Sequence, residues 1–193
     1  MKEHIKIFAA LGKMRISLLA TVTMVAGYIL ARGGATWPLV FLTGGVFLLA
    51  CGSSALNQVQ ERDIDRNMKR TMGRPLPTGR VSTRYALVTA VICLTVGSVV
   101  ILASSNLTAT ALGALTVLWY NGVYTPLKRV TAFAAVPGGV VGAIPPVLGW
   151  VAGGGSPADP RILAVAVFFF MWQIPHFWLL LLSTAGDDYE KAG

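Results

Sequence analysis

The sequence predicts an all-α fold, a polytopic membrane helical bundle with about six transmembrane helices. Of the 193 residues, 54% are hydrophobic and only 12% are charged, and the mean hydropathy is +0.65. Soluble domains carry about 25% charged residues, and disordered chains are poor in apolar ones, so this composition excludes both classes. The charged residues also gather in short segments between long apolar runs, and the basic ones favour alternate segments.

Five long runs of the chain, each of 16 residues or more, contain no Asp, Glu, Lys or Arg, and their lengths set the number of spans. A membrane-spanning helix takes about 20 apolar residues. The longest run has 43 residues and therefore holds two helices, with a turn at Ser104-Ser105-Asn106. The runs cover residues 16–31, 33–60, 85–127, 130–158 and 162–186. The predicted spans are 14–31, 37–56, 85–103, 107–125, 132–152 and 162–183.

Some spans have features of their own. The span 14–31 is the shortest, and Arg15 and Arg32 at its ends can extend it by reaching back to the interface. A cleaved signal peptide is the alternative for this segment, although no small-residue cleavage site follows it. In the last two spans, Pro145-Pro146 and Pro175 free backbone carbonyls. The membrane tolerates such carbonyls at a cavity or where another helix packs against them, so these spans either line a cavity or are kinked for packing.

The distribution of Lys and Arg orients the bundle. With six spans, both termini and the loops after the second and fourth spans share one side, which holds 14 of the 16 basic residues. Only Arg32 and Arg161 lie on the other side. Cytoplasmic segments are enriched in Lys and Arg, so both termini are predicted to be cytoplasmic, in a multi-pass protein of the cell inner (plasma) membrane. Because the basic residues flank several spans instead of forming one basic domain, nucleic acid is not expected as a partner.

Acidic residues gather after the second span. Asn57, Glu61 and Asp65 fall at i, i+4 and i+8, so they share a face if the helix continues, with Asp63 nearby. Carboxylates at this spacing repel each other, which a purely structural surface avoids. Oxygen ligands suit Mg²⁺ and guanidinium groups suit phosphate, so the segment predicts a magnesium-diphosphate site. The alternative is a solvated salt-bridge face, for instance Asp65 with Lys69. The neighbouring basic stripe consists of Arg62, Arg66 and Arg70.

Two further polar segments belong to the same predicted membrane face. Asp188, after the sixth span, is a candidate ligand for the same Mg²⁺, or part of a polar tail that anchors the last helix. At the end of the fourth span, Tyr120, Tyr124 and Lys128 recur at i, i+4 and i+8, beside Arg129. The two basic residues are candidates to bind phosphate, and the tyrosine rings to flank a cation. An interfacial aromatic belt with its basic flank is the alternative.

The sixth span contains Trp172 and His176 in the segment Trp-Gln-Ile-Pro-His-Phe. A His inside a bilayer is costly and usually faces a partner or a cavity. His176 is therefore a candidate to ligate iron or to hydrogen-bond a substrate. A hydrogen bond to a carbonyl freed near Pro175 is the alternative.

Four motifs follow one another along the chain. The first is the acidic segment 57–65, continuing into Arg70-Thr71-x-x-Arg74-Pro75-Leu76-Pro77. The second is Tyr-Thr-Pro-Leu-Lys-Arg at 124–129, the third is Gly-Ala-Ile-Pro-Pro-Val-Leu-Gly-Trp at 142–150, and the fourth is Trp-Gln-x-Pro-His-Phe at 172–177. In this order they resemble the UbiA superfamily of intramembrane prenyltransferases, and the fourth is typical of the branch that farnesylates protohaem IX. The resemblance covers the chain from Lys13 to Asp188.

The resemblance implies Mg²⁺-dependent transfer of a farnesyl group from farnesyl diphosphate to a vinyl group of protohaem IX (haem b), which forms haem O. The implied metal ligands are Glu61, Asp63, Asp65 and Asp188. The implied diphosphate-binding residues are Lys13, Arg15, Asn57, Arg70, Arg74, Lys128 and Arg129. Tyr120 and Tyr124 are implied to shield the allylic cation, with Lys128 and Arg129 sharing the catalytic role, and Trp172 and His176 to seat the haem. Contact with haem A synthase or a terminal oxidase assembly is a further expectation.

The sequence also departs from the family pattern. Glu61 stands where the superfamily often has Asp, Gln58 where many members have a second Asp, and Met14 where the family commonly has Pro. Chains of the family continue through several more helices, so residues 1–193 are expected to form a single transmembrane prenyltransferase domain truncated at its C-terminus.

The sequence is compatible with three alternative functions. They are a UbiA-type prenyltransferase for an aromatic or quinone precursor, a small-solute transporter, and an inactive fragment. The segment 172–177 argues against the first. The absence of a mid-span carboxylate argues against the second, because ion-coupled transporters usually carry charge at the midplane.

Overall fold

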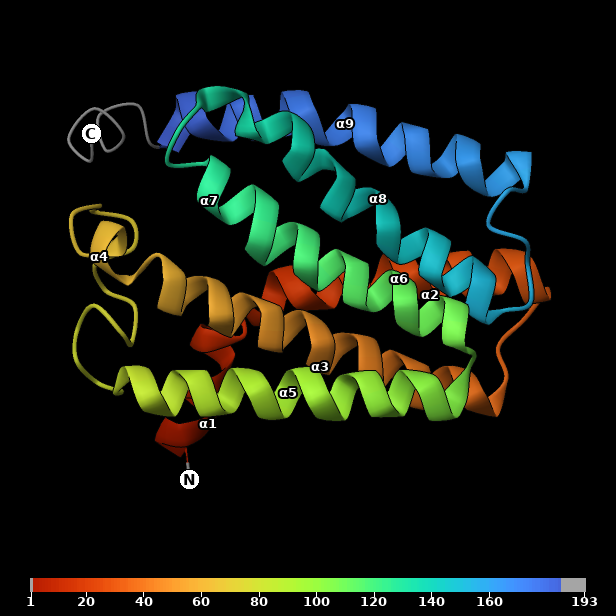
Figure 1. Cartoon of the computed structure of the whole chain (residues 1–193), viewed down its shortest axis with the longest axis horizontal. Coiled ribbons are helices and arrows are strands. Elements are labelled where there is room, and N and C mark those ends of the chain that lie inside the picture. Colours follow the sequence, from red (N-terminus) through yellow and green to blue (C-terminus); the bar gives the residue numbers. More distant parts are fainter. Residues whose placement is uncertain (1, 185–193) are drawn as a thin grey trace.

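The computed structural model describes residues 2–184, which form a bundle of long helices that run alternately in opposite directions (Figure 1). The α-helices are α1 (Lys2–Leu11), α2 (Met14–Arg32), α3 (Trp37–Gln60), α4 (Arg62–Asp65), α5 (Thr83–Ser104), α6 (Leu107–Leu118), α7 (Thr125–Leu127), α8 (Ala135–Ala152) and α9 (Pro160–Thr184). A π-helix, η1 (Trp119–Tyr124), joins α6 to α7, and a 3-10 helix, η2 (Ala132–Ala134), precedes α8.

All six predicted spans are helical. Five helices, α2, α3, α5, α8 and α9, are each long and apolar enough to cross a membrane. The fourth predicted span corresponds to α6, η1 and α7, which follow one another without interruption from Leu107 to Leu127. Within this segment the α-helix changes to a π-helix at Trp119, next to the predicted site residue Tyr120.

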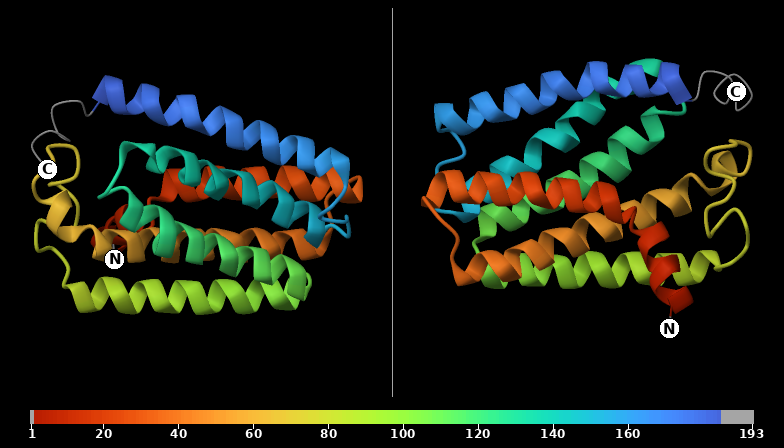
Figure 2. Two further views of the ribbon diagram at one scale, coloured as in Figure 1. Left: turned by 45° about the horizontal axis from the view of Figure 1, so that its top comes forward. Right: turned by 180° about the vertical axis from the view of Figure 1, so that it is seen from behind.

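The connections between the helices gather at the two ends of the bundle (Figures 1 and 2). The turns 33–36, 105–106 and 153–159 lie at one end. The segments 61–82 and 128–134 lie at the other, and α1 lies toward this second end at an angle to the long helices (Figure 2). The predicted site residues that lie within residues 1–129 are therefore all at this second end.

Glycines bring the helices into backbone contact. A Cβ on Gly149 of α8 would lie 1.9 Å from the carbonyl oxygen of Met24 in α2, and one on Gly27 would lie 2.0 Å from that of Pro146. Between α3 and α5, a Cβ on Gly97 would lie 2.7 Å from the amide nitrogen of Leu49. The helix α8 continues through Pro145-Pro146, and the carbonyl of Pro146 faces α2. This pair of prolines therefore serves helix packing.

A small apolar cluster fixes the end of the bundle that carries the site residues. It joins the end of α1, the C-terminal half of α3, the start of α5 and the loop 66–82, and it consists of Leu11, Ala55, Leu76, Ala86 and Ala90. Because Leu11 and Leu76 belong to this cluster, the backbone next to Lys13 and next to Arg74 is anchored to the bundle. The larger core fills the middle of the bundle, around Met24, Leu42 and Ile101.

Candidate functional site

The end of α3 keeps its polar residues in one helical register. The amide of Glu61 donates to the carbonyl of Asn57, and the amide of Asp65 donates to that of Glu61, both at 2.9 Å. The predicted shared face of Asn57, Glu61 and Asp65 thus extends through the short helix α4. The predicted basic stripe is wrong, because helix α4 ends at Asp65 and the chain then enters the loop that contains Arg70.

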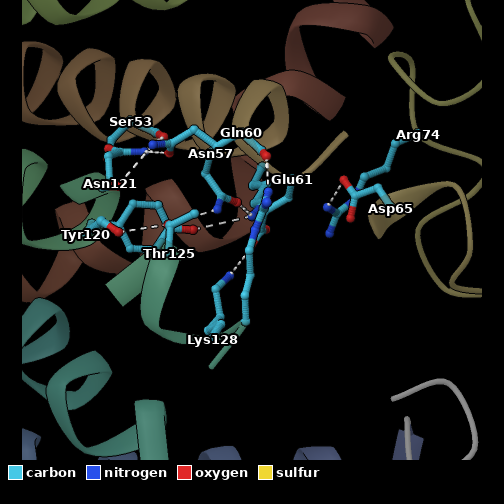
Figure 3. Close-up of polar contacts among 12 residues, drawn as sticks. Ser53, Asn57, Gln60, Glu61, Asp65, Arg74, Tyr120, Asn121, Thr125 and Lys128 are labelled. Atoms are coloured by element: carbon cyan, nitrogen blue, oxygen red, sulfur yellow. Dashed lines mark hydrogen bonds and ion pairs between the residues drawn. The ribbon is translucent and has the colours of Figure 1, made fainter. Parts of the chain in front are cut away.

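Both carboxylates of this face form ion pairs with cations from distant segments (Figure 3). Glu61 pairs with Lys128, which follows α7. Asp65 pairs with Arg74 of the loop 66–82, at 2.6 Å between Oδ2 and a guanidinium nitrogen. Asp65 is only 3% exposed, so this face is not the solvated salt-bridge surface that was the alternative.

Lys13 reaches the same face from the break between α1 and α2. Its Nζ donates to Oδ1 of Asn57 at 2.6 Å and to the hydroxyl of Tyr120 at 3.4 Å. Its backbone is left-handed, with φ 45° and ψ 52°, and Lys13 is the one non-glycine residue within 2–184 with a positive φ. Burial, reinforced by the charges of Arg74 and Lys128, lowers the pKa of Lys13 to about 7.

The π-helix η1 is tied to α3 by a buried amide network (Figure 3). Asn121 accepts a hydrogen bond from the Ser53 hydroxyl at 2.6 Å, and its Nδ2 donates to the Ser53 carbonyl at 3.0 Å. The side chains of Asn121 and Gln60 are also joined, at 3.1 Å. Asn57 extends the network, since its Nδ2 donates to the Thr125 hydroxyl at 3.0 Å. π-Helices are frequent at functional sites, and this one brings Tyr120 and Tyr124 next to the end of α3.

The tyrosines of η1 form an aromatic wall. The ring centroids of Tyr120 and Tyr124 are 5.7 Å apart, and Nζ of Lys128 lies 4.9 Å from the Tyr124 ring centroid. Phe177 of α9 meets Tyr124 edge to face, with 6.1 Å between centroids. Tyr124 is 7% exposed, so it does not belong to an outward aromatic belt.

Asn57 contacts the ammonium group of Lys13, whereas Gln58 contacts the backbone that precedes Lys13. The side chain of Gln58 is fully buried, and its Nε2 donates to the carbonyls of Ala10 and Leu11, at 2.8 and 2.9 Å. Its Oε1 has no hydrogen-bond partner within the described part of the chain. In the sequence, Gln58 stands out only as a departure from a family pattern.

Other predicted residues are not part of this cluster. Asp63 is exposed and pairs with Arg62, with 3.5 Å between Oδ1 and Nε, and Arg15 is exposed at the start of α2. Trp172 and His176 stack on each other, with ring centroids 4.7 Å apart, and both are exposed on α9. Asp188 lies outside the described residues.

Arg70 and Arg129 lie at the edges of the cluster. The guanidinium of Arg129 donates to the carbonyl of Gln60. Arg70 lines a cavity of about 700 Å³ between α1 and the loop 66–82, to which Lys6, Arg74 and Arg80 also contribute. Arg74 therefore belongs both to the lining of this cavity and to the ion pair with Asp65.

The donor set fits a magnesium ion that arrives with a diphosphate. Within residues 2–184, no three His, Cys, Asp or Glu side chains gather closely enough to hold a metal by themselves. Mg²⁺ typically binds through one or two carboxylates, and waters and substrate phosphates complete its shell. Glu61 and Asp65 supply two carboxylates, and Lys13, Arg74 and Lys128 supply the positive charge that phosphate oxygens require.

Comparison with known proteins identifies related sequences. Residues 20–193 match the model of the UbiA prenyltransferase family. The protoheme IX farnesyltransferase of Geobacter sulfurreducens is 47% identical over 95% of this chain and 67% of the relative. That of Nitratidesulfovibrio vulgaris is 43% identical over 95% of this chain and 64% of the relative, and the human mitochondrial one is 37% identical over 97% and 42%. The chain spans about two thirds of the length of these bacterial relatives.

Solved structures share the fold. A structure of digeranylgeranylglyceryl phosphate synthase superposes with a TM-score of 0.81 at 18% identity, over 98% of this chain and 67% of that one. A UbiA homolog from Archaeoglobus fulgidus, bound to GPP and Mg²⁺, gives a TM-score of 0.75 at 20% identity, over 97% and 66%. The expected all-α membrane fold is confirmed.

Proposed function

Because the chain belongs to the UbiA prenyltransferase family, we propose that it provides the diphosphate-binding part of an enzyme that transfers a farnesyl group from farnesyl diphosphate to a vinyl group of protohaem IX, which yields haem O. The acceptor is proposed from the relatives, which are named protoheme IX farnesyltransferase. The farnesyl donor is proposed from the same relatives, and the binding of its diphosphate is proposed from the geometry of the site.

The two ion pairs, Glu61 with Lys128 and Asp65 with Arg74, are the observation that carries the proposal. Each carboxylate has a cationic partner before any substrate binds. When a magnesium diphosphate binds, the carboxylates can bind the metal and the cations can bind phosphate oxygens. A buried charge is costly without a partner. Each charged side chain would have a partner of opposite charge both without and with the ligand, so the site can bind this ligand with little rearrangement.

Mg²⁺, held by Glu61 and Asp65, would supply the Lewis acid that neutralises the leaving diphosphate. Lys13 and Lys128 share that task, because each ammonium group already points toward the polar end of α3. Fixed charges that face the leaving group stabilise it most where water is excluded, and the half-buried Lys13 is bonded to the fully buried Asn57.

Departure of the diphosphate leaves an allylic farnesyl cation, and the wall of Tyr120 and Tyr124 suits it. The ammonium of Lys128 lies over the Tyr124 ring, so the face of this ring already holds a cation. A vinyl carbon of haem b would then form the new carbon–carbon bond. Water would add a hydroxyl to the other vinyl carbon and release a proton, which gives the hydroxyethylfarnesyl group.

We propose that the haem binds against α9 and that the site lies at the cytoplasmic face of the cell inner (plasma) membrane. Trp172 and His176 stack on the exposed side of α9, where a flat macrocycle has room to approach. The end of the bundle with the segments 61–82 and 128–134 carries most of the basic residues, which is typical of the cytoplasmic side.

The test is product formation in membranes that contain this chain, supplied with haem b, farnesyl diphosphate and Mg²⁺. We expect haem O by mass spectrometry, its loss with EDTA, and its loss in Glu61→Gln and Asp65→Asn. Asp159→Asn, which removes a carboxylate at the opposite end of the bundle, is the matched control and should retain product. Prenylated 4-hydroxybenzoate without haem O would instead assign an aromatic acceptor. The absence of both products, from this chain and from a chain extended to the length of its relatives, would contradict the proposal.

A further inference from the structure

We infer that Gln58 is a positioning residue that holds the backbone next to Lys13, so that the Lys13 ammonium points at the diphosphate. The inference rests on the proposed function, in which Lys13 binds that diphosphate. It assigns a role to a fully buried amide that the diphosphate chemistry does not otherwise use.

Gln58 caps the end of α1 from another helix. The last carbonyls of a helix lack intrahelical partners, and a buried carbonyl needs a hydrogen bond. The Nε2 group of Gln58 supplies both of its hydrogens, one to Ala10 and one to Leu11, at 2.8 and 2.9 Å. The helix α1 therefore ends at Leu11 because a side chain of α3 takes its terminal carbonyls.

This cap stabilises an unusual backbone. Lys13 has a left-handed conformation, which residues other than Gly, Asn and Asp rarely adopt. Two further contacts hold the break between α1 and α2 against the neighbouring helices. The Ser17 hydroxyl donates to the Gly12 carbonyl at 2.7 Å, and a Cβ on Gly12 would lie only 2.9 Å from Sγ of Cys51. Without these ties, α1 and α2 are free to join as one regular helix, which would turn the Lys13 side chain away.

Two consecutive residues of α3 thus hold Lys13 at opposite ends. Asn57 accepts from the Lys13 ammonium at 2.6 Å, and Gln58 fixes the backbone two and three residues before it. The arrangement has a cost, since Oε1 of Gln58 is buried without a partner among residues 2–184. A cap that leaves one polar atom unsatisfied adds little to stability, but its two hydrogen bonds fix the backbone that sets the direction of Lys13.

The test is a double-mutant cycle on ligand binding to this chain in detergent, with magnesium pyrophosphate as the probe and calorimetry as the readout. The probe needs no acceptor, so the result does not depend on the identity of the haem. We expect Lys13→Met to weaken binding about tenfold or more, because it removes a charge-assisted hydrogen bond. Gln58→Met, which keeps the volume but has no donor, should weaken binding about tenfold in the native chain and less than twofold in the Lys13→Met background.

Thr23→Val is the matched control for a part-buried hydrogen bond in α2 that does not touch the break, since the Thr23 hydroxyl donates to the Ala20 carbonyl at 2.8 Å. It should bind pyrophosphate as the native chain does. If Gln58→Met does not fold, Ser17→Ala perturbs the same break more mildly and should show the same dependence on Lys13.

The outcomes separate the two proposals. Unchanged binding in Lys13→Met would remove Lys13 from the diphosphate site and contradict that part of the proposed function. Weak binding in Lys13→Met together with native binding in Gln58→Met would overturn the inference alone. Equal losses from Gln58→Met in both backgrounds would also overturn it, because they would mean that Gln58 acts only on overall stability.

Discussion

Glu61 at the end of α3 and Lys128 after α7 form an ion pair that joins the first acidic motif to the segment that follows the π-helix. Both side chains are largely buried, with exposed fractions of 13% and 23%. The pair links two motifs that the sequence separates, and it places a cation next to a carboxylate that suits a metal. In the proposed reaction, Glu61 exchanges Lys128 for Mg²⁺, and Lys128 exchanges Glu61 for a phosphate oxygen.

Replacing Lys128 by Met should lower the turnover of farnesyl diphosphate about 100-fold, because a positive charge that stabilises the leaving group is lost. The measurement is the initial rate of haem O formation in membranes at saturating substrates. Lys69→Met removes an exposed charge from the neighbouring loop and should change this rate less than twofold. A loss confined to KM in Lys128→Met would mean that Lys128 binds the substrate without favouring the transition state.

The stability of the protein should rise between pH 7 and pH 10 because of Lys13. Its folded-state pKa is about 7, below the ordinary lysine value of 10.5. Above pH 10.5 neither state carries this proton, and between the two values only the unfolded state does, so the free energy of unfolding increases with pH. Below about pH 7 the full penalty of burying the charge applies. The gain is up to about 4 kcal/mol, at about 1.4 kcal/mol per pKa unit.

The measurement for Lys13 is the unfolding midpoint in detergent as a function of pH, in the native chain and in Lys13→Met. The difference between the two curves isolates this residue from other titrating groups. Lys13→Met should be the more stable chain at pH 7, and the difference should shrink toward pH 10. Parallel curves would contradict the lowered pKa.

Asn121→Ala should destabilise the fold by about 2 kcal/mol, because it leaves buried polar groups of Ser53 and Gln60 without their partners. It should also lower turnover, since the π-helix that carries the tyrosine wall loses its tie to α3. Asn67→Ala, at an exposed position, is the control and should leave both quantities unchanged. Thermal unfolding and haem O formation on the same preparations check the two effects.

Gly149→Ala should be severely destabilising, by about 3 kcal/mol, because its Cβ would meet the Met24 carbonyl at 1.9 Å and force α2 and α8 apart. Gly44→Ala, where no atom lies within 4 Å of the added carbon, is the matched control in α3. It should be neutral or stabilising by up to about 1 kcal/mol, since Ala favours helix over Gly. Equal stability of the two variants would contradict the close contact of α2 with α8.

Much of the fold could be predicted from the sequence, because it depends on local properties. Charge-free runs give the spans, and helical spacing brings Asn57, Glu61 and Asp65 onto one face. The fourth span shows the limit of this reasoning. The spacing of Tyr120 and Tyr124 predicts an α-helix, whereas the structure has a π-helix there. Its distinct contacts come from Asn121, whose partners lie in α3, and a local pattern does not record them.

The remaining site contacts were missed for the same reason. Gln58, Asn121 and Phe177 act through segments that are distant in sequence, and each resembles an ordinary helix residue when read alone. The basic stripe from Arg62 to Arg70 failed because it assumed that the helix continues past Asp65. A helical pattern is reliable only as far as the helix extends.

The glycine contacts between α2 and α8 and between α3 and α5 have a practical consequence for purification. Lipid tails and detergent tails are equally apolar, so helices in either medium associate through close packing and not through transfer out of water. These two pairs touch backbone to backbone at Gly27, Gly97 and Gly149. Their association therefore depends on shape, and the bundle should tolerate exchange of its native lipids for a mild detergent.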